Sequence, residues 1–289
     1  MSTQAACGLA PRRSWRRRLL RTVGLLAGVY LGVIVVLLAL ENSLVYHPTP
    51  ARVDWQPPPA AAVRDVELTS ADGTRIHGWW YPREGAAGAL LYFHGNAGNL
   101  SHRGALMAEL RRELGVPVLI IDYPGYGRSG GRPSEAGCYA AADAAYDWLT
   151  REQKVAPAKL LLYGASLGGG VATDLASRRE HGALILVSTF TSMPDVGQGL
   201  YPWLPVRWLM RNRYDSLTKV RQCRRPVFVA HGTADRLIPF AQGERLYAAA
   251  NEPKRFLAMR GADHNEDGDP GFFAALKEFL REAGARAGR

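Results

Sequence analysis

Short apolar runs that alternate with stretches of helical length constrain the fold of this chain more than any other feature. Six such runs begin at Ala89, Pro117, Lys159, Ala183, Pro226 and Lys254. Apolar residues recur at helical spacing over residues 100–114, 134–151, 167–180, 240–250 and 270–283. Strands that are apolar throughout and alternate with helices are typical of a parallel sheet covered by helices on both faces. The sequence therefore predicts an α/β fold with a mostly parallel sheet.

A β-hairpin is predicted ahead of these runs, at the start of a domain over residues 63–289. Residues 63–69 alternate between apolar and polar, Ala71-Asp72-Gly73 supply a turn, and residues 74–81 return as a second strand. Residues 41–62 are rich in proline and lack periodic apolar positions, so we expect them to form an extended linker.

An insertion over residues 191–225 interrupts the alternation of strands and helices and is rich in aromatic and aliphatic side chains. In a doubly wound sheet, an excursion of this kind leaves the carboxyl ends of the strands, where ligands bind. We therefore interpret it as a lid. Trp203 and Trp208 are its candidate substrate contacts, and packing within the lid is an equal alternative for each.

Residues 22–40 carry no charge, and a helix of this length just spans a hydrocarbon core of about 30 Å. The run lacks the small-residue cleavage pattern of a signal peptide, so we expect a transmembrane anchor that stays attached. Arginines crowd its N-terminal flank only, which predicts a cytoplasmic segment 1–21 and an extracytoplasmic domain, periplasmic in a bacterium.

The formal net charge of +10 does not indicate a nucleic-acid partner. More than half of it comes from one N-terminal block, Arg12, Arg13, Arg16, Arg17, Arg18 and Arg21. The remaining sequence has no basic stripe interleaved with aromatic residues, so nucleic-acid binding is not expected. Cys7, Cys138 and Cys223 lack zinc-site spacing, so no metal is expected; unpaired thiols are favoured over a Cys138–Cys223 disulfide.

A strand-to-helix turn with the sequence Gly164-Ala165-Ser166-Leu167-Gly168 is the strongest indication of chemistry. A G-x-S-x-G motif in this context places its serine on a sharp turn above the sheet, where glycines are needed because side chains would clash. We predict Ser166 as the nucleophile. An ordinary glycine-rich turn is the alternative.

A serine hydroxyl needs an adjacent base that a carboxylate orients. Asp235 and His264 each follow a predicted strand, which gives the order Ser, Asp, His along the chain. We predict His264 as general base and Asp235 as the acid. Asp263 is a rival acid beside the histidine, and Glu266, Asp267 and Asp269 are expected to cap the last helix.

Backbone N–H groups must also stabilise the tetrahedral oxyanion of an acyl-transfer reaction. We assign this role to Leu167 and to Asn96, which lies in the small-residue loop that follows the first of the parallel strands. His94 in that loop is expected to stabilise the turn. Tyr126, in the turn Asp122-Tyr123-Pro124-Gly125-Tyr126, is expected to line the site.

These motifs resemble the α/β-hydrolase superfamily, and in particular its membrane-tethered members with one N-terminal span. The resemblance covers residues 44–280 and rests on LVYHPTP, HGNAGN, DYPGYGRSGGRPSE, YGASLGG, RWLMRNRYDSL and HGTADRLIP. It implies an eight-stranded sheet and hydrolysis of carboxylic ester, thioester or amide bonds without a cofactor. Some similar proteins are depalmitoylases with a cysteine-rich N-terminus, which this chain lacks.

The residues and the resemblance together predict a serine hydrolase that cleaves ester or thioester bonds of small-molecule or lipid-like acyl substrates, held at a membrane by its anchor. A serine peptidase related to the aminopeptidases is the first alternative, because a Ser-His-Asp triad does not distinguish esters from amides. A binding protein that keeps the fold without turnover is the second.

Overall fold

The computed structural model describes residues 13–264 and 271–287, which divide into two compact units. The first unit ends at Glu41, and its described part consists mainly of helix α1 (Arg13–Ala39). Within Trp15–Ala39, a window of 18 residues reaches a mean hydropathy of 2.5, so this helix is long and apolar enough to cross a membrane, a criterion that a signal sequence also meets. A short helix, α2 (Glu41–Val45), follows. The second unit begins at Asn42 and contains the described strands.

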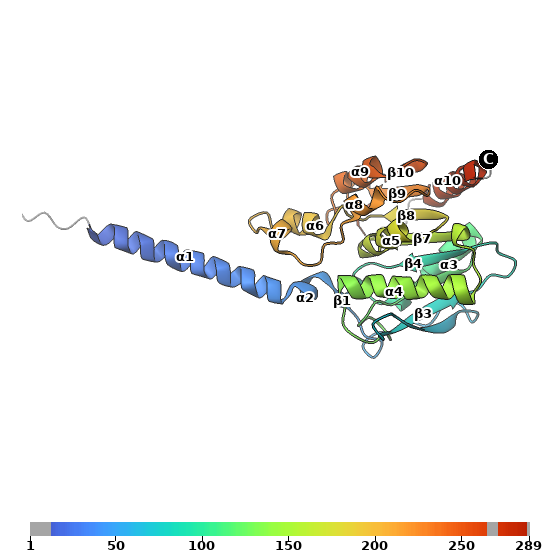
Figure 1. Ribbon diagram of the computed structural model, residues 1–289, viewed down its shortest axis with the longest axis horizontal. Coiled ribbons are helices and arrows are strands. Elements are labelled where there is room, and N and C mark those ends of the chain that lie inside the picture. The colour runs from blue at the N-terminus through green and yellow to red at the C-terminus, as the bar shows by residue number, and fades with distance from the viewer. Residues whose placement is uncertain (1–12, 265–270, 288–289) are drawn as a thin grey trace, which may run out of the picture. The chain divides into compact units, whose positions relative to one another are not determined.

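Within the described residues, an eight-stranded sheet forms the centre of the second unit (Figure 1). Its order is β10-β9-β8-β7-β4-β6-β3-β2, with β10 to β6 parallel and the β2–β3 hairpin antiparallel. The strands are β2 (Arg64–Thr69), β3 (Arg75–Tyr81), β4 (Ala89–Phe93), β6 (Val118–Ile121), β7 (Leu160–Ala165), β8 (Ala183–Val187), β9 (Val227–Gly232) and β10 (Lys254–Met259). The mostly parallel α/β fold predicted from the sequence is confirmed.

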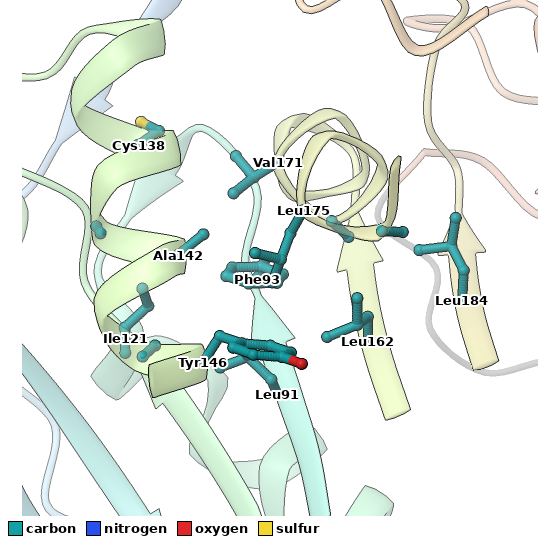
Figure 2. Close-up of a cluster of buried hydrophobic side chains, with 14 of the residues drawn as sticks. Leu91, Phe93, Ile121, Cys138, Ala142, Tyr146, Leu162, Val171, Leu175 and Leu184 are labelled. Carbon is teal, nitrogen blue, oxygen red and sulfur yellow. The ribbon is translucent and has the colours of Figure 1, made fainter. Parts of the chain in front are cut away.

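Two hydrophobic clusters bury the sheet, because successive side chains of a strand point to opposite faces. Leu91 and Phe93 of β4 belong to one cluster, and Leu90 and Tyr92 belong to the other. Figure 2 shows the first, in which strand residues pack against α4 (Glu135–Asp147) and α5 (Leu167–Arg178). Helices α3 (Gly104–Leu114) and α10 (Phe272–Ala287) contribute to the second cluster. Burial on both faces explains why the strand sequences are apolar throughout.

The predicted helices are present, and most differences lie at their ends. A 3₁₀ turn, η1 (Leu100–Arg103), precedes α3, and a π-helical turn, η2 (Trp148–Glu152), continues α4. A 3₁₀ turn, η3 (Pro157–Lys159), leads into β7, and α9 (Phe240–Ala249) lies between β9 and β10. Helix α10 runs to Ala287, beyond the predicted end at residue 283. Its predicted first residue, Pro270, and the expected capping residues Glu266, Asp267 and Asp269 lie outside the described residues.

The proline-rich segment expected as a linker is bound to the domain instead. Strand β1 (His47–Pro48) pairs in parallel with β5 (Ala97–Gly98), and Pro50 forms a bridge to Gly127. The ring of Trp55 lies 5.4 Å from that of Trp79 in β3. Two-residue strands that pair across about fifty positions leave no periodic pattern, so this contact has no signal in the sequence.

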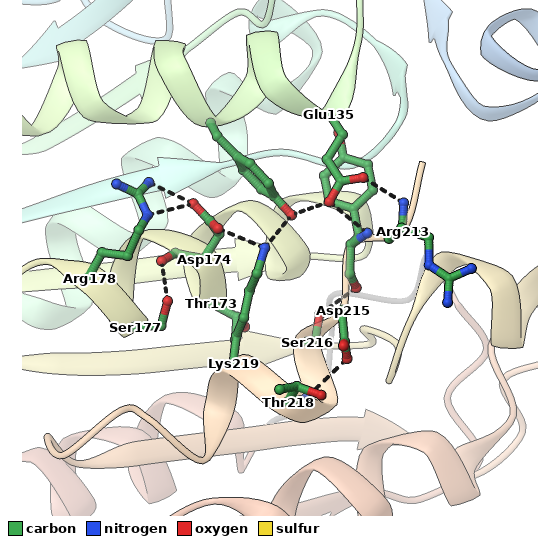
Figure 3. A network of polar contacts seen from close by, with 12 residues as sticks. Glu135, Thr173, Asp174, Ser177, Arg178, Arg213, Asp215, Ser216, Thr218 and Lys219 are labelled. Carbon is green, nitrogen blue, oxygen red and sulfur yellow. Dashed lines mark hydrogen bonds and ion pairs between the residues drawn. The ribbon is translucent and has the colours of Figure 1, made fainter. Parts of the chain in front are cut away.

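The insertion over residues 191–225 forms the short helices α6 (Met193–Leu200), α7 (Val206–Leu209) and α8 (Ser216–Val220). A polar network holds its second half against the domain (Figure 3). Glu135, at the start of α4, accepts hydrogen bonds from the backbone N–H groups of Arg213 at 2.5 Å and Tyr214 at 2.9 Å. Lys219 of α8 forms an ion pair with Asp174 of α5 at 2.7 Å. The insertion is therefore fixed at the end that leads back to β9.

Candidate active site

Ser166 lies at the turn between β7 and α5, with a strained backbone at φ +50° and ψ −119°. This conformation is costly for a residue with a Cβ and persists only where its surroundings enforce it. The Ser166 N–H donates to the Val187 carbonyl at 3.0 Å, and its carbonyl accepts from Gly169 N–H at 2.9 Å and Thr189 Oγ1 at 2.7 Å. The neighbouring strand β8 and the segment that follows it thus hold the serine in place.

Gly164 and Gly168 allow the strand and helix around Ser166 to come into close contact. A Cβ at residue 164 would overlap the backbone of Gly168 and Gly169. A Cβ at residue 168 would overlap the Phe93 carbonyl at the end of β4. Only hydrogen atoms fit in these two gaps, so the turn requires glycine on both sides of the serine.

The structure brings Ser166, His264 and Asp235 together, although they lie far apart in sequence. Ser166 Oγ is 3.0 Å from His264 Nε2, and His264 Nδ1 is 2.8 Å from Asp235 Oδ2. The Asp235 carboxylate is buried, whereas the His264 side chain is 9% exposed. The imidazole therefore connects the Ser166 hydroxyl to a fully buried carboxylate.

Backbone and side-chain donors surround Asp235. Its Oδ1 accepts hydrogen bonds from the N–H groups of Leu237 at 3.0 Å and Ile238 at 2.8 Å. His231, for which the sequence predicts no role, places Nε2 3.3 Å from Oδ2 and 2.8 Å from the Ile238 carbonyl. Burial acts to raise the pKa of Asp235, but the bonds from His231, His264 and the Ile238 N–H outweigh it and hold the pKa well below its usual range.

The depressed pKa of Asp235 predicts an acid-dependent loss of stability. The carboxylate stabilises the folded state fully above its unfolded pKa of about 4, and this contribution is lost as the pH falls toward the folded value. We expect the urea midpoint of the wild type to fall more between about pH 4 and pH 2 than that of Asp235→Asn, which has no carboxylate to protonate. Equal falls in the two proteins would contradict a stabilised carboxylate at this position.

Asp263, the rival acid, is directed elsewhere. Its carboxylate accepts from the Arg236 side chain at 2.5 Å and from the backbone N–H groups of Arg236 at 3.0 Å and His264 at 2.8 Å. The Arg236 N–H, the Arg236 side chain and the His264 N–H lower the pKa of Asp263 to about 2. Asp263 thus contacts the backbone of His264 and not its imidazole, which Asp235 contacts.

The loop over residues 94–99, called the 94–99 loop below, lies directly beside Ser166. A Cβ built on Gly95 would be 3.5 Å from Ser166 Cβ and 4.0 Å from its Oγ. Among the described residues, no protein acceptor is paired with the N–H of Asn96 or of Leu167, the first residue of α5. His94 is buried and its Nδ1 lies 2.7 Å from the Gly95 carbonyl, as expected of a residue that stabilises the turn.

The three predicted substrate contacts differ in their surroundings. Tyr126 has no exposed surface, and its hydroxyl donates to the Asn96 carbonyl at 2.7 Å. Tyr126 therefore supports the 94–99 loop through this hydrogen bond. Because it is fully buried, this corrects the expectation that it lines the site. Trp203 is 58% exposed and Trp208 is 85% exposed, so the indoles lie largely on the surface of the insertion.

The described residues contain neither a metal-ligating cluster nor a disulfide between their cysteines. Within the described residues, no group of three or more His, Cys, Asp or Glu side chains is placed to hold a metal ion. Cys138 and Cys223 are buried free thiols, so the disulfide considered between them is absent. Burial raises the pKa of each thiol to about 12, which keeps both protonated at neutral pH.

Comparison with known proteins gives related chains and folds. Residues 88–220 match a family model described as the alpha/beta hydrolase fold. The chain is 40% identical to the uncharacterized protein Rv2307c of Mycobacterium tuberculosis over 92% of this chain and 96% of that protein. It is 29% identical to the alpha/beta hydrolase domain-containing protein WAV2 of Arabidopsis thaliana, over 77% of this chain and 80% of that one. The esterase Pf2001 of Pyrococcus furiosus has a similar structure, with a TM-score of 0.66 at 20% identity, over 83% of this chain and 98% of that chain. The chain belongs to the α/β-hydrolase superfamily.

Proposed function

We propose that this protein is a serine hydrolase that cleaves carboxylic ester or thioester bonds. The observation that carries the proposal is the hydrogen-bonded series from Ser166 through His264 to Asp235, with the serine on a strained turn. A hydroxyl paired with an oriented imidazole is the arrangement that activates a serine for attack on a carbonyl carbon.

In the proposed reaction, Ser166 Oγ attacks the substrate carbonyl and His264 Nε2 takes the hydroxyl proton. The N–H groups of Leu167 and Asn96 stabilise the resulting oxyanion. His264 then returns the proton to the leaving alcohol or thiol, which leaves an acyl group on Ser166. Water, deprotonated by His264, attacks this acyl-enzyme; the acyl–Oγ bond breaks, the acid is released, and His264 returns the proton to Ser166 Oγ. Asp235 keeps Nδ1–H of His264 facing the carboxylate throughout, so Nε2 is free to accept the proton.

Apolar acyl groups are the proposed substrate class. The exposed indoles of Trp203 and Trp208 on the insertion provide apolar surface within the same unit as Ser166. The structurally similar Pf2001 protein of Pyrococcus furiosus is named an esterase, which fits hydrolysis of this bond type.

A membrane location is part of the proposal. Residues Trp15–Ala39 form a helix long and apolar enough to span a bilayer, and Arg16, Arg17, Arg18 and Arg21 lie toward its N-terminal end. Because Lys and Arg next to a span stay on the cytoplasmic side, we place the N-terminus inside and residues 42–289 on the opposite side. An uncleaved anchor would hold the hydrolase close to lipid.

Labelling with a fluorophosphonate probe tests the proposed nucleophile. In the full-length protein in detergent, we expect one labelled peptide, and it should contain Ser166. Ser166→Ala should abolish labelling. Ser177→Ala is the matched control, since Ser177 lies on the same helix with its hydroxyl bonded to the Asp174 carbonyl, and its labelling should equal that of the wild type.

Chain-length series of p-nitrophenyl esters and acyl thioesters, with aminoacyl p-nitroanilides beside them, then identify the bond that is cleaved. We expect turnover of the esters or thioesters and a preference among chain lengths that measures the acyl site. Anilide turnover above ester turnover would replace the proposal with a peptidase. A folded wild type that takes up no label and hydrolyses none of these compounds would favour the binding protein.

A further inference from the structure

We propose that residues 45–49, called the strap below, position the 94–99 loop and with it the N–H of Asn96. This role rests on the proposed function, because it concerns the oxyanion site of that same reaction. The strap lies within the LVYHPTP motif, for which the hydrolytic mechanism alone provides no role. Oxyanion donors must be held to a fraction of an ångström to be effective, so whatever fixes this loop affects the rate of reaction.

The strap runs beside the 94–99 loop as a parallel strand, with His47 opposite Ala97. The His47 N–H donates to the Asn96 carbonyl at 2.9 Å. Two residues further along, the Thr49 N–H donates to the Gly98 carbonyl at 2.9 Å. In the opposite direction, Asn96 Nδ2 donates to the Val45 carbonyl at 3.0 Å. Asn99 Nδ2 also donates to the Thr49 carbonyl at 2.9 Å. Hydrogen bonds therefore join Val45, His47 and Thr49 of the strap to this loop.

These bonds leave Asn96 little freedom. Its carbonyl accepts from both the His47 N–H and the Tyr126 hydroxyl, so both lone pairs are engaged. The preceding peptide group is held by His94, whose Nδ1 lies 2.7 Å from the Gly95 carbonyl. In a trans peptide the carbonyl and the N–H point in opposite directions. A fixed Gly95 carbonyl and a fixed Asn96 side chain together set the direction of the Asn96 N–H.

The strap is itself fixed, which a positioning element requires. The Tyr46 side chain is 2% exposed, and its hydroxyl lies 2.6 Å from Asn212 Oδ1 and 2.9 Å from the Tyr214 hydroxyl. Asn212 Nδ2 also donates to Asn42 Oδ1 at 2.9 Å. The strap thus connects the 94–99 loop to the part of the insertion that contains Tyr214, whose N–H donates to Glu135. All of these contacts come from residues after Glu41, so deletion of residues 1–41 would leave them in place, whereas deletion of residues 1–49 would remove them.

His47 offers a test that separates backbone from side chain. Its side chain is exposed, and its backbone N–H makes the bond to Asn96. His47→Pro and His47→Ala both remove the imidazole, but only proline removes the N–H. Deleting one oxyanion donor costs about 10²–10³-fold in kcat, so a displaced donor should cost about tenfold. With p-nitrophenyl butyrate and the full-length protein, we expect kcat of His47→Pro to be about tenfold below that of His47→Ala, with KM unchanged.

A trifluoromethyl ketone provides a readout that a general loss of stability would not move. It adds to an active serine and places an oxyanion where the transition state has one, so its affinity should fall by the same factor as kcat/KM. Asn96→Ala is the second variant, since it keeps the N–H and loses only the bond to Val45; a kcat about threefold to tenfold lower is expected. If His47→Pro does not fold, the kcat of Asn96→Ala still tests whether the strap positions the 94–99 loop.

The outcomes distinguish the strap's role from the hydrolase function itself. Equal kcat and inhibitor affinity in His47→Pro and His47→Ala, in a protein that is labelled at Ser166, would overturn the strap's role alone. An unchanged kcat in Asn96→Ala would do the same. Absence of labelling and of ester hydrolysis in the wild type would overturn the proposed function, and the strap's role with it.

Discussion

Asp235→Asn is expected to lower kcat about 10⁴-fold while the protein stays folded. The Asn Oδ1 can still accept from the N–H groups of Leu237 and Ile238, so the turn keeps its two bonds. Its amide nitrogen then faces His264 Nδ1, where Asp235 Oδ2 now lies at 2.8 Å. Because an amide N–H donates, His264 must accept at Nδ1 and carry its proton on Nε2. That tautomer cannot take the proton of Ser166, so the loss should appear in kcat measured with a p-nitrophenyl ester.

Asp263→Asn is the matched control for this prediction. The two carboxylates lie close in the structure, since both contact His264, but Asp263 binds its backbone N–H and the exposed Arg236 side chain. The asparagine oxygen can keep the backbone bonds, and an exposed ion pair contributes little, so kcat should stay within about fivefold of the wild type. A large loss in Asp263→Asn together with a small one in Asp235→Asn would reverse the assignment of the acid.

Gly168→Ala is expected to lower the free energy of unfolding by about 3 kcal/mol or more. The added Cβ would overlap the carbonyl group of Phe93 and approach that of His94. These are backbone atoms at the end of β4, so no side chain can rotate away. Either α5 or the start of the 94–99 loop must move, although ten residues of α5 are buried. Urea unfolding of the full-length protein in detergent, followed by circular dichroism, measures the effect.

Gly199→Ala controls for the substitution itself. Gly199 lies in α6, is exposed, and has no atom within 4 Å of an added Cβ. Alanine is the better helix former by about 1 kcal/mol, so stability should be unchanged or slightly higher. If Gly168→Ala were as stable as Gly199→Ala, the close approach of α5 to β4 would not be as tight as described.

The parts of the fold that local sequence patterns encode could be predicted. Runs such as Leu90–Phe93 are apolar throughout because both sheet faces are covered, and this signal is independent of distant contacts. The order of Ser166, Asp235 and His264 likewise follows from motifs at the ends of strands, and the structure places the three within hydrogen-bond distance. Their catalytic roles remain predictions.

The parts that depend on contacts distant in sequence could not be predicted. His231 lies near the end of β9, and the turn after this strand brings Asp235, four residues later, back to its side chain. Its position within an apolar strand sequence gives no indication of this polar contact. Tyr126 is expected beside the substrate because its loop is close to the site, but burial of its ring depends on Tyr123 and His94. The pairing of the proline-rich segment with the 94–99 loop is the same kind of case. Each of these is a tertiary contact that leaves no periodic pattern of apolar residues in the local sequence.

Because Ser166 has a positive φ, selection for stability and selection for catalytic activity favour different residues at this position. Glycine adopts a φ of +50° more readily than serine does, so the most stable chain at this position would not be an active one. Directed evolution for heat resistance alone would therefore be expected to tolerate or favour loss of the nucleophile, whereas concurrent selection for turnover would retain it. Retention of serine at this position throughout an evolving population would indicate that the population is selected for catalytic turnover.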